Sequence, residues 1–136
     1  MAELQIPGIE VEYAFSITMN FAERIDFVGP RRGKGYVPPA SGTVYGPLLN
    51  GRVVPYSGAD FAIFREVSQG IKANTHYMLQ ADDGTWIYIN NRGYLNRSPD
   101  PANPGQTKLY FRMTPMFEAP AGPHEWLART MIVGTG

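Results

Sequence analysis

Every second residue is apolar over residues 11–21, and this period of two most limits the folds open to the chain. Large apolar side chains occupy the odd positions, whereas smaller or polar side chains occupy the even ones. Successive side chains of a β-strand point to opposite faces, and a helix would not keep one face apolar at that spacing. The pattern therefore predicts a strand over residues 11–21.

Turn residues divide the rest of the chain into short segments. The 15 glycines and 12 prolines leave little room for a long helix. We expect a basic, glycine-rich loop over residues 29–35, an irregular polar loop over 93–106 and one helical turn over 123–127. The further predicted strands are 22–28, 41–45, 51–55, 60–65, 71–80, 85–91, 108–114 and 127–134.

Eight or nine evenly spaced short strands in 136 residues predict an all-β protein, either an antiparallel sandwich or a closed barrel. The length is typical of a single domain, so we expect one domain over residues 1–136. A barrel of about eight strands encloses side chains or one small ligand, and it removes the exposed edges of a flat sheet.

The composition argues against several classes of function. The 12 basic and 12 acidic residues cancel, which gives no support to binding of nucleic acid or of an anionic membrane. Without cysteine there is no disulfide, thiolate zinc site or cysteine nucleophile. No apolar run approaches the ~18 residues that span a bilayer, and the first residues do not resemble a signal peptide. We therefore expect a soluble, cytoplasmic protein.

The sequence indicates neither a metal site nor an organic cofactor. His76 and His124 are far apart and lack the spacing of a metal-binding pair. Residues 29–35 lack the spacing of a phosphate-binding loop, so we expect them to form a basic rim loop that steers an anionic substrate. The glycine pattern of dinucleotide-binding proteins and a Ser/His/Asp set are both absent from the sequence.

The segment after the turn signal at 82–84 has one polar and aromatic face and one apolar face. Because residues two apart share a face, Ile87 and Ile89 lie together on the apolar face. The opposite face holds Trp86, Tyr88, Asn90 and Arg92. A second predicted strand repeats the pattern with Tyr110, Arg112 and Thr114 on one face. Two such faces suggest one shared polar surface.

That surface can point in either of two directions. If the isoleucine face points into the barrel, the tyrosines and arginines are merely surface residues. If the polar face points inward, the barrel has a polar lumen, and the outward apolar face must be covered by a second subunit. We favour the inward arrangement, because both faces of these strands are rich in large residues. It predicts a homo-oligomer with a small-molecule ligand in its lumen.

Candidate roles follow from the chemistry of these side chains. Arg92, Arg112 and Arg129 are suited to hold an anion or a carbonyl oxygen, since a guanidinium presents a rigid fork of donors. The alternative for each arginine is a structural ion pair with Asp60 or Glu118.

Other residues are candidates for acid/base roles or for contacts with a substrate. Asp60 is the candidate general base, and its alternative role is to cap a turn. Tyr77, Tyr88 and Tyr110 are candidates to donate hydrogen bonds to a developing oxyanion, and their alternative is ordinary packing. The remaining candidates are Glu118 as a weaker acid/base group and Phe61, Trp86 and Trp126 as aromatic contacts for a substrate.

The chain also resembles a family of small uncharacterised proteins grouped as domain of unknown function 3237. The resemblance lies in the order and spacing of many short marks. They are Gly42, Gly46-Pro47, Gly51, Gly58, Asp60-Phe61, Tyr77, Asp82-Asp83-Gly84, Ile87-Tyr88, Asn91-Arg92-Gly93, Tyr110-Phe111-Arg112, Pro115, Phe117-Glu118, Trp126-Leu127-Ala128-Arg129 and Val133-Gly134. The resemblance implies a single up-and-down antiparallel barrel of about eight strands, lipocalin-like in general shape, and it implies no established activity.

The leading hypothesis is a cofactor-independent lyase, isomerase or cyclase that acts on a small aromatic or carbonyl-bearing metabolite in the lumen. Asp60, Tyr88 and Arg112 would be its catalytic residues, because such reactions need positioned acid/base groups and charge stabilisation. The alternatives are a non-catalytic carrier or sensor barrel, and a scaffold or oligomer subunit with a filled lumen.

Overall fold

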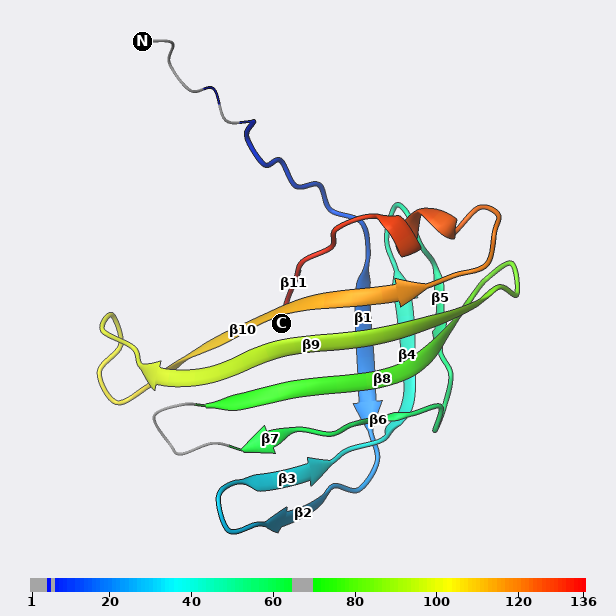
Figure 1. Ribbon diagram of the computed structural model, residues 1–136. Helices are drawn as coiled ribbons and strands as arrows, with labels where there is room; N and C mark the ends of the chain where they lie inside the picture. The colour runs from blue at the N-terminus through cyan, green and yellow to red at the C-terminus, as the bar shows by residue number, and fades with distance from the viewer. Residues whose placement is uncertain (1–4, 6, 65–69) are drawn as a thin grey trace.

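The computed structural model describes residue 5, residues 7–64 and residues 70–136, and it shows an antiparallel all-β protein (Figure 1). Within these residues one sheet of eleven strands forms, and one short 3-10 helix, η1 (Glu125–Arg129), precedes the last strand. The strands are β1 (Ser16–Phe21), β2 (Ile25–Val28), β3 (Gly33–Tyr36), β4 (Pro39–Tyr45), β5 (Gly51–Val53), β6 (Ala59–Asp60), β7 (Ile63–Phe64), β8 (Ile71–Ala81), β9 (Trp86–Pro99), β10 (Thr107–Glu118) and β11 (Gly134–Thr135).

Three long strands, β8, β9 and β10, form one continuous part of the sheet. β8 and β9 pair from Ile71 opposite Leu95 to Gln80 opposite Trp86. The hairpin between them closes where the Ala81 N–H donates to the Thr85 carbonyl at 2.9 Å, and Gly84 takes a φ of 88° that favours glycine. The predicted hairpin at 82–84 is therefore confirmed.

The sheet curls at the edge of β8 that does not pair with β9. Three short strands pair with this edge one after another. β5, β6 and β7 lie along this edge, and they lead into β4 and β3. β1 and β4 cross behind the long strands in Figure 1, so the sheet folds back over itself as a half-barrel. The all-β antiparallel barrel class expected from the sequence is confirmed.

The core lies between the long strands and the strands behind them. Ile87, Ile89 and Leu79 are at most 1 % exposed, and burying an aliphatic side chain of this size stabilises a fold by about 1.5–3 kcal/mol. The core cluster consists of Val44, Leu49, Val53, Tyr77, Leu79, Ala81, Ile87, Ile89, Phe117 and Leu127. The odd-numbered side chains of β8 and β9 therefore face the inside of the half-barrel.

The strand predicted over 11–21 is shorter than its alternation suggests. β1 begins only at Ser16, which pairs with Tyr45 at the end of β4. The chain then turns away at Gly46, so no strand of the described part of the chain lies beside residues 11–15, and Val11 is 78 % exposed. The alternation of apolar residues includes residues 11–15, but β4 ends at Tyr45 and does not pair with them.

The structure corrects two predictions near the C-terminus. The irregular loop expected over 93–106 is wrong up to Pro99, because β9 continues to that residue and pairs with Thr107 of β10. The strand predicted over 127–134 is also wrong. Its first three residues belong to η1, which buries Leu127 in the core and confirms a helical turn near the one expected over 123–127, and β11 begins only at Gly134.

Smaller corrections concern the other short strands. The predicted strand 60–65 is divided into β6 and β7, and β3 begins inside the predicted loop 29–35. Ser68, Gln69 and Gly70 predict a further turn from their residue types, and most of this turn lies outside the described residues. No helix in the described part of the chain is both long enough and apolar enough to cross a membrane.

Candidate functional site on the outer face of β8 and β9

The polar face of β9 points out of the half-barrel. Ile87 is 0 % exposed, whereas the adjacent Trp86 is 52 % exposed. The prediction of an inward polar face and a polar lumen is therefore wrong, because the isoleucine face supplies the apolar surface that the core requires. The argument for a homo-oligomer depended on an outward isoleucine face, so it no longer holds.

The register of the sheet nevertheless brings several of the predicted polar residues together. His76 of β8 lies opposite Asn90 of β9, and Asn74 of β8 lies opposite Arg92. Side chains that are directly opposite in an antiparallel pair lie on the same face, about 4.5–5.5 Å apart. We call the group formed by Asn74, His76, Tyr88, Asn90 and Arg92 the outer-face cluster.

A histidine and a tyrosine form a hydrogen-bonded pair in this cluster. His76 Nδ1 and Tyr88 Oη are 2.5 Å apart, and both residues are half-buried. The two rings are tilted, with centroids 6.0 Å apart. Either atom can be the donor, depending on the histidine tautomer, so the pair is able to take up or release a proton.

Two amide oxygens beside this pair are buried without a partner. Neither Asn74 Oδ1 nor Asn90 Oδ1 has a hydrogen-bond partner in the described part of the structure. A buried acceptor left unsatisfied costs about 1–3 kcal/mol, and such a group requires an explanation. Asn91 Oδ1 and His124 Nδ1 are also unpartnered, but Asn91 belongs to the inward series of β9 and His124 lies beside the hairpin turn.

Asp60 lies next to the cluster but is already engaged. Its Oδ1 accepts the backbone N–H of Asn74 at 3.0 Å, and its backbone pairs with Val37. The carboxylate thus ties β6 to β8, a structural role like the one weighed against the general-base role. Phe61 follows it, 41 % exposed, and its ring contacts that of Tyr36 at a centroid distance of 5.5 Å.

Two charged side chains flank the cluster. Arg92 is exposed and makes no hydrogen bond or ion pair with any described residue, so its guanidinium is available to a ligand. Glu118 is exposed and lies opposite Tyr88 on β10. Within the described residues, Arg92 therefore forms no ion pair with Asp60 or with Glu118, which was the alternative role for this arginine.

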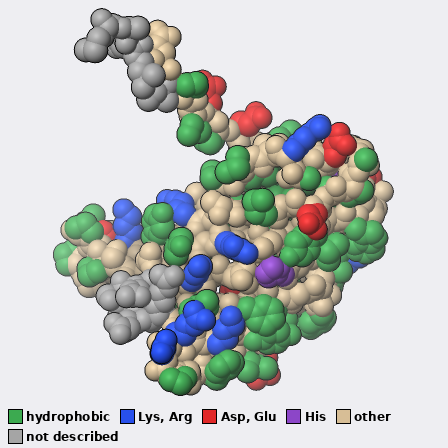
Figure 2. Space-filling model, viewed as in Figure 1, with side chains coloured by type: hydrophobic (Ala, Val, Ile, Leu, Met, Phe, Trp, Pro, Cys, Tyr) green, Lys and Arg blue, Asp and Glu red, His purple; other side chains and the backbone are tan. Residues whose placement is uncertain are grey.

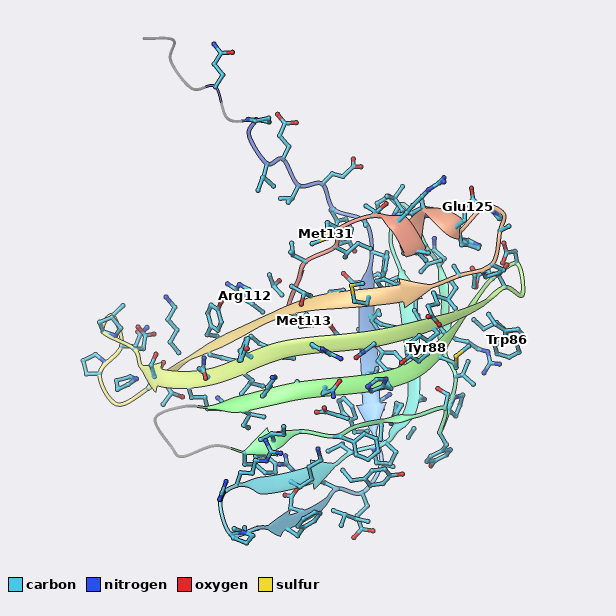
Figure 3. All side chains as sticks on the ribbon, viewed as in Figure 1. Trp86, Tyr88, Arg112, Met113, Glu125 and Met131 are labelled. Atoms are coloured by element: carbon cyan, nitrogen blue, oxygen red, sulfur yellow. The ribbon has the colours of Figure 1, made fainter. Side chains whose placement is uncertain are left out.

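The other predicted site residues lie elsewhere. Tyr77 is 3 % exposed in the core, and this burial raises the pKa of its phenol. Arg112 lies on the distant part of β10, away from Tyr88 (Figure 3), and its guanidinium lies 5.0 Å from the centre of the Tyr110 ring.

The predicted site residues near the C-terminus and the hairpin also lie outside the cluster. Trp126 packs against the core from η1, and Arg129 pairs with Glu125 at 3.2 Å on the same helix. Trp86 lies opposite Gln80, beside the hairpin.

The sequence reasoning missed His76 and Asn74, although a signal for both was present. A hairpin centred on Asp83 places each residue of β8 opposite a defined residue of β9. Counting outward from that turn pairs His76 with Asn90 and Asn74 with Arg92. His76 directly precedes the inward Tyr77, so strand alternation also places it on the outer face.

His124 serves the hairpin turn. Its Nε2 lies 2.8 Å from Asp83 Oδ2. Hydrogen bonds from the side chain and backbone of Thr85, and then from His124, lower the pKa of Asp83 to about 2. Among the described residues, no three His, Asp or Glu side chains gather closely enough to hold a metal ion.

Comparison with solved structures defines the class of the protein. A protein of unknown function from Rhodopseudomonas palustris superimposes with a TM-score of 0.81 at 28 % identity, over 96 % of this chain and 90 % of that one. A β-barrel-like protein from Acinetobacter baumannii shares the fold, with a TM-score of 0.73 at 24 % identity over 88 % of this chain and 87 % of that one. The fold is therefore that of a β-barrel-like protein.

The sequence defines the family. Residues 9–136 match the family described as protein of unknown function (DUF3237), and the chain belongs to it. A curated relative from Clostridium acetobutylicum, described as a UPF0311 protein, is 30 % identical over 140 residues, which cover 94 % of this chain and 85 % of the relative. The family assignment expected from the sequence marks is confirmed.

Proposed function

We propose that this protein binds a small carbonyl-bearing molecule on the outer-face cluster and catalyses proton transfer on it. The single observation behind this proposal is the His76–Tyr88 hydrogen bond beside two buried, unpartnered amide oxygens. Histidine is the side chain that exchanges protons most readily near neutral pH, and a positioned acid/base group contributes about 10²–10⁴-fold to a reaction rate.

The surrounding groups favour one chemical class of ligand. Asn74 Oδ1 and Asn90 Oδ1 accept hydrogen bonds, so the ligand presents hydroxyl or N–H donors to them. Arg92 supplies donors for a carbonyl or enolate oxygen. The rings of Phe61 and Tyr36 offer aromatic surface at the edge of the cluster. These features support a small hydroxylated aromatic ketone or aldehyde.

The proposed chemistry is of the lyase, isomerase or cyclase type. In each, a base removes the proton next to a carbonyl, and donors stabilise the enolate that forms. His76 would take the proton at Nε2 while its Nδ1–H donates to Tyr88 Oη, the resulting imidazolium would return the proton to the product carbon, and Arg92 would stabilise the oxyanion. His76 takes the role that the sequence suggested for Asp60, since the Asp60 carboxylate holds the backbone of β8.

Deuterium exchange of a ketone probe tests the proposal. The α-protons of 4-hydroxyphenylacetone in D₂O report proton abstraction directly by ¹H NMR. We expect the wild-type protein to accelerate this exchange over buffer, and both His76→Gln and Tyr88→Phe to reduce the protein-dependent rate at least about 10-fold. His124→Gln is the matched control and retains the rate, because His124 contacts the hairpin turn.

Two results would count against catalysis. Exchange no faster than in buffer, or equal rates in wild type and both cluster variants, would contradict the proton-transfer role. Saturable binding of the ketone without exchange would instead favour the carrier or sensor function, with the same cluster as a binding site.

A further inference from the structure

A second site lies on the inner side of the sheet, at the β2–β3 end. Here an open, shallow cavity of about 630 Å³ lies between β2, the turn that follows it, and Phe64 of β7. Phe64 pairs with Ile71, which belongs to the inward-facing series of β8. The cavity and the outer-face cluster are therefore on opposite faces of the sheet. Small-molecule sites commonly have volumes of ~300–1,000 Å³.

The lining of this cavity combines positive charge with apolar surface. Three arginines, Arg24, Arg31 and Arg32, line it with one aspartate, Asp26, which gives a formal charge of +2 among the described lining residues. Phe27 and Val28 on the same cavity are 64 % and 89 % exposed. Figure 2, which shows the opposite, outer face of the long strands, has further Lys and Arg side chains over β3 and β7. This excess of positive charge favours an anionic ligand over a neutral one.

Arg24 is held in place with its donors free. Its Nε donates to both carboxylate oxygens of Asp26, at 2.7 and 2.8 Å, and its guanidinium lies 4.5 Å from the centre of the Phe64 ring. The two terminal nitrogens make no hydrogen bond with any described residue. A guanidinium fixed in this way is prepared to receive a carboxylate through two parallel hydrogen bonds.

Two glycines of β3 make this arrangement possible. A Cβ on Gly35 would lie 3.0 Å from Asp26 Oδ1 and 3.0 Å from the Phe64 ring. A Cβ on Gly33 would lie 3.1 Å from the same ring. Any side chain there would displace either the ring beneath Arg24 or the carboxylate that orients it. The β3 sequence therefore preserves the position of the guanidinium.

We propose that this cavity is a binding site for a small organic carboxylate with an aromatic or alkyl body. The terminal nitrogens of Arg24 hold the carboxylate, Arg31 and Arg32 add attraction at the entrance, and Phe64 and Val28 contact the apolar part. The site is independent of the proton-transfer chemistry proposed for the outer-face cluster.

Calorimetric titration with three probes tests this site. Phenylacetate carries both features, phenylacetamide lacks the charge, and inorganic phosphate lacks the apolar body. We expect saturable binding of phenylacetate and at least about 10-fold weaker binding of the other two. Arg24→Met should weaken phenylacetate binding at least about 10-fold, whereas Arg52→Met on β5, whose guanidinium bonds Gln80, should not.

Variants separate the two sites and guard against misfolding. If Arg24→Met does not fold, Arg24→Lys keeps the charge but loses the fork, and we expect affinity to fall several-fold. His76→Gln should leave phenylacetate binding unchanged. Unchanged affinity in the folded Arg24 variant, equal binding of phenylacetamide or phosphate, or no saturable binding of phenylacetate would each overturn the proposal.

Discussion

The two faces of β9 differ in what they do for the protein. On the inner face, Ile87 and Ile89 are almost completely buried and hold the long strands against those behind them. On the outer face, Tyr88 and Asn90 are half-buried, and one bonds His76 while the other keeps an unpartnered oxygen. One strand thus separates packing from the proposed chemistry by alternation alone, and the comparison indicates where substitutions should affect stability and where they should affect the proposed function.

The largest effect on stability is expected on the inner face. Ile89→Ala removes a side chain that is 1 % exposed, and truncations of this kind cost about 2–5 kcal/mol. Met116→Ala is the matched control, because Met116 lies opposite Asn90 on the outer face and is 66 % exposed. Its expected cost is within about 0.5 kcal/mol. Urea unfolding measures both, and similar costs would contradict the assignment of faces.

On the outer face a substitution should stabilise the fold. Asn90→Leu replaces a buried, unpartnered amide oxygen with an apolar group of similar size, so we expect the free energy of unfolding to rise by about 1 kcal/mol. The same variant should lose the exchange activity. Asn50→Leu is the control, since both polar atoms of the Asn50 amide bond to Gly46, and it should destabilise the protein. A destabilised Asn90→Leu would show that Asn90 is structural.

The strand faces could be predicted from the sequence, but their direction could not. Alternation around 87–92 and the turn at 82–84 were sufficient to place Tyr88, Asn90 and Arg92 together. Both faces hold large side chains, so neither face was the obvious core. The length of β9 was missed because Pro99 is followed by further prolines and glycine, a composition typical of loops, although Pro99 itself pairs with Thr107.

The rest of the site depended on contacts between distant segments. The role proposed for His76 depends on the neighbouring strand, where Tyr88 lies within hydrogen-bond distance. Asp60 loses its candidate role because β6 pairs with β8, which brings its carboxylate to the Asn74 N–H. Arg24 and Phe64 are 40 positions apart in the numbering, yet β3 sits between their strands and brings them together. Local patterns do not contain such information.

The smallest effect concerns the hairpin that sets the register of both faces. The pKa of Asp83 is lowered from 3.8 to about 2, so its hydrogen bonds stabilise the fold above about pH 4 and this contribution is lost as the pH falls towards 2. Asp83→Asn should therefore make the loss of stability in acid less steep. Thermal unfolding between pH 2 and pH 5 measures this. Asp82→Asn is the control, and an equal change in both variants would contradict the role of Asp83.

The central claim is that the ligand binds to the outer face of β9 and not to the inner one. Titration of the labelled protein with 4-hydroxyphenylacetone tests this directly by NMR. The account predicts saturable shifts of the Asn74 and Asn90 side-chain amide resonances, with the Ile87 and Ile89 methyl resonances unchanged. Shifts of the isoleucine methyls without shifts of the asparagine amides would place the ligand in the interior of the half-barrel and contradict the account.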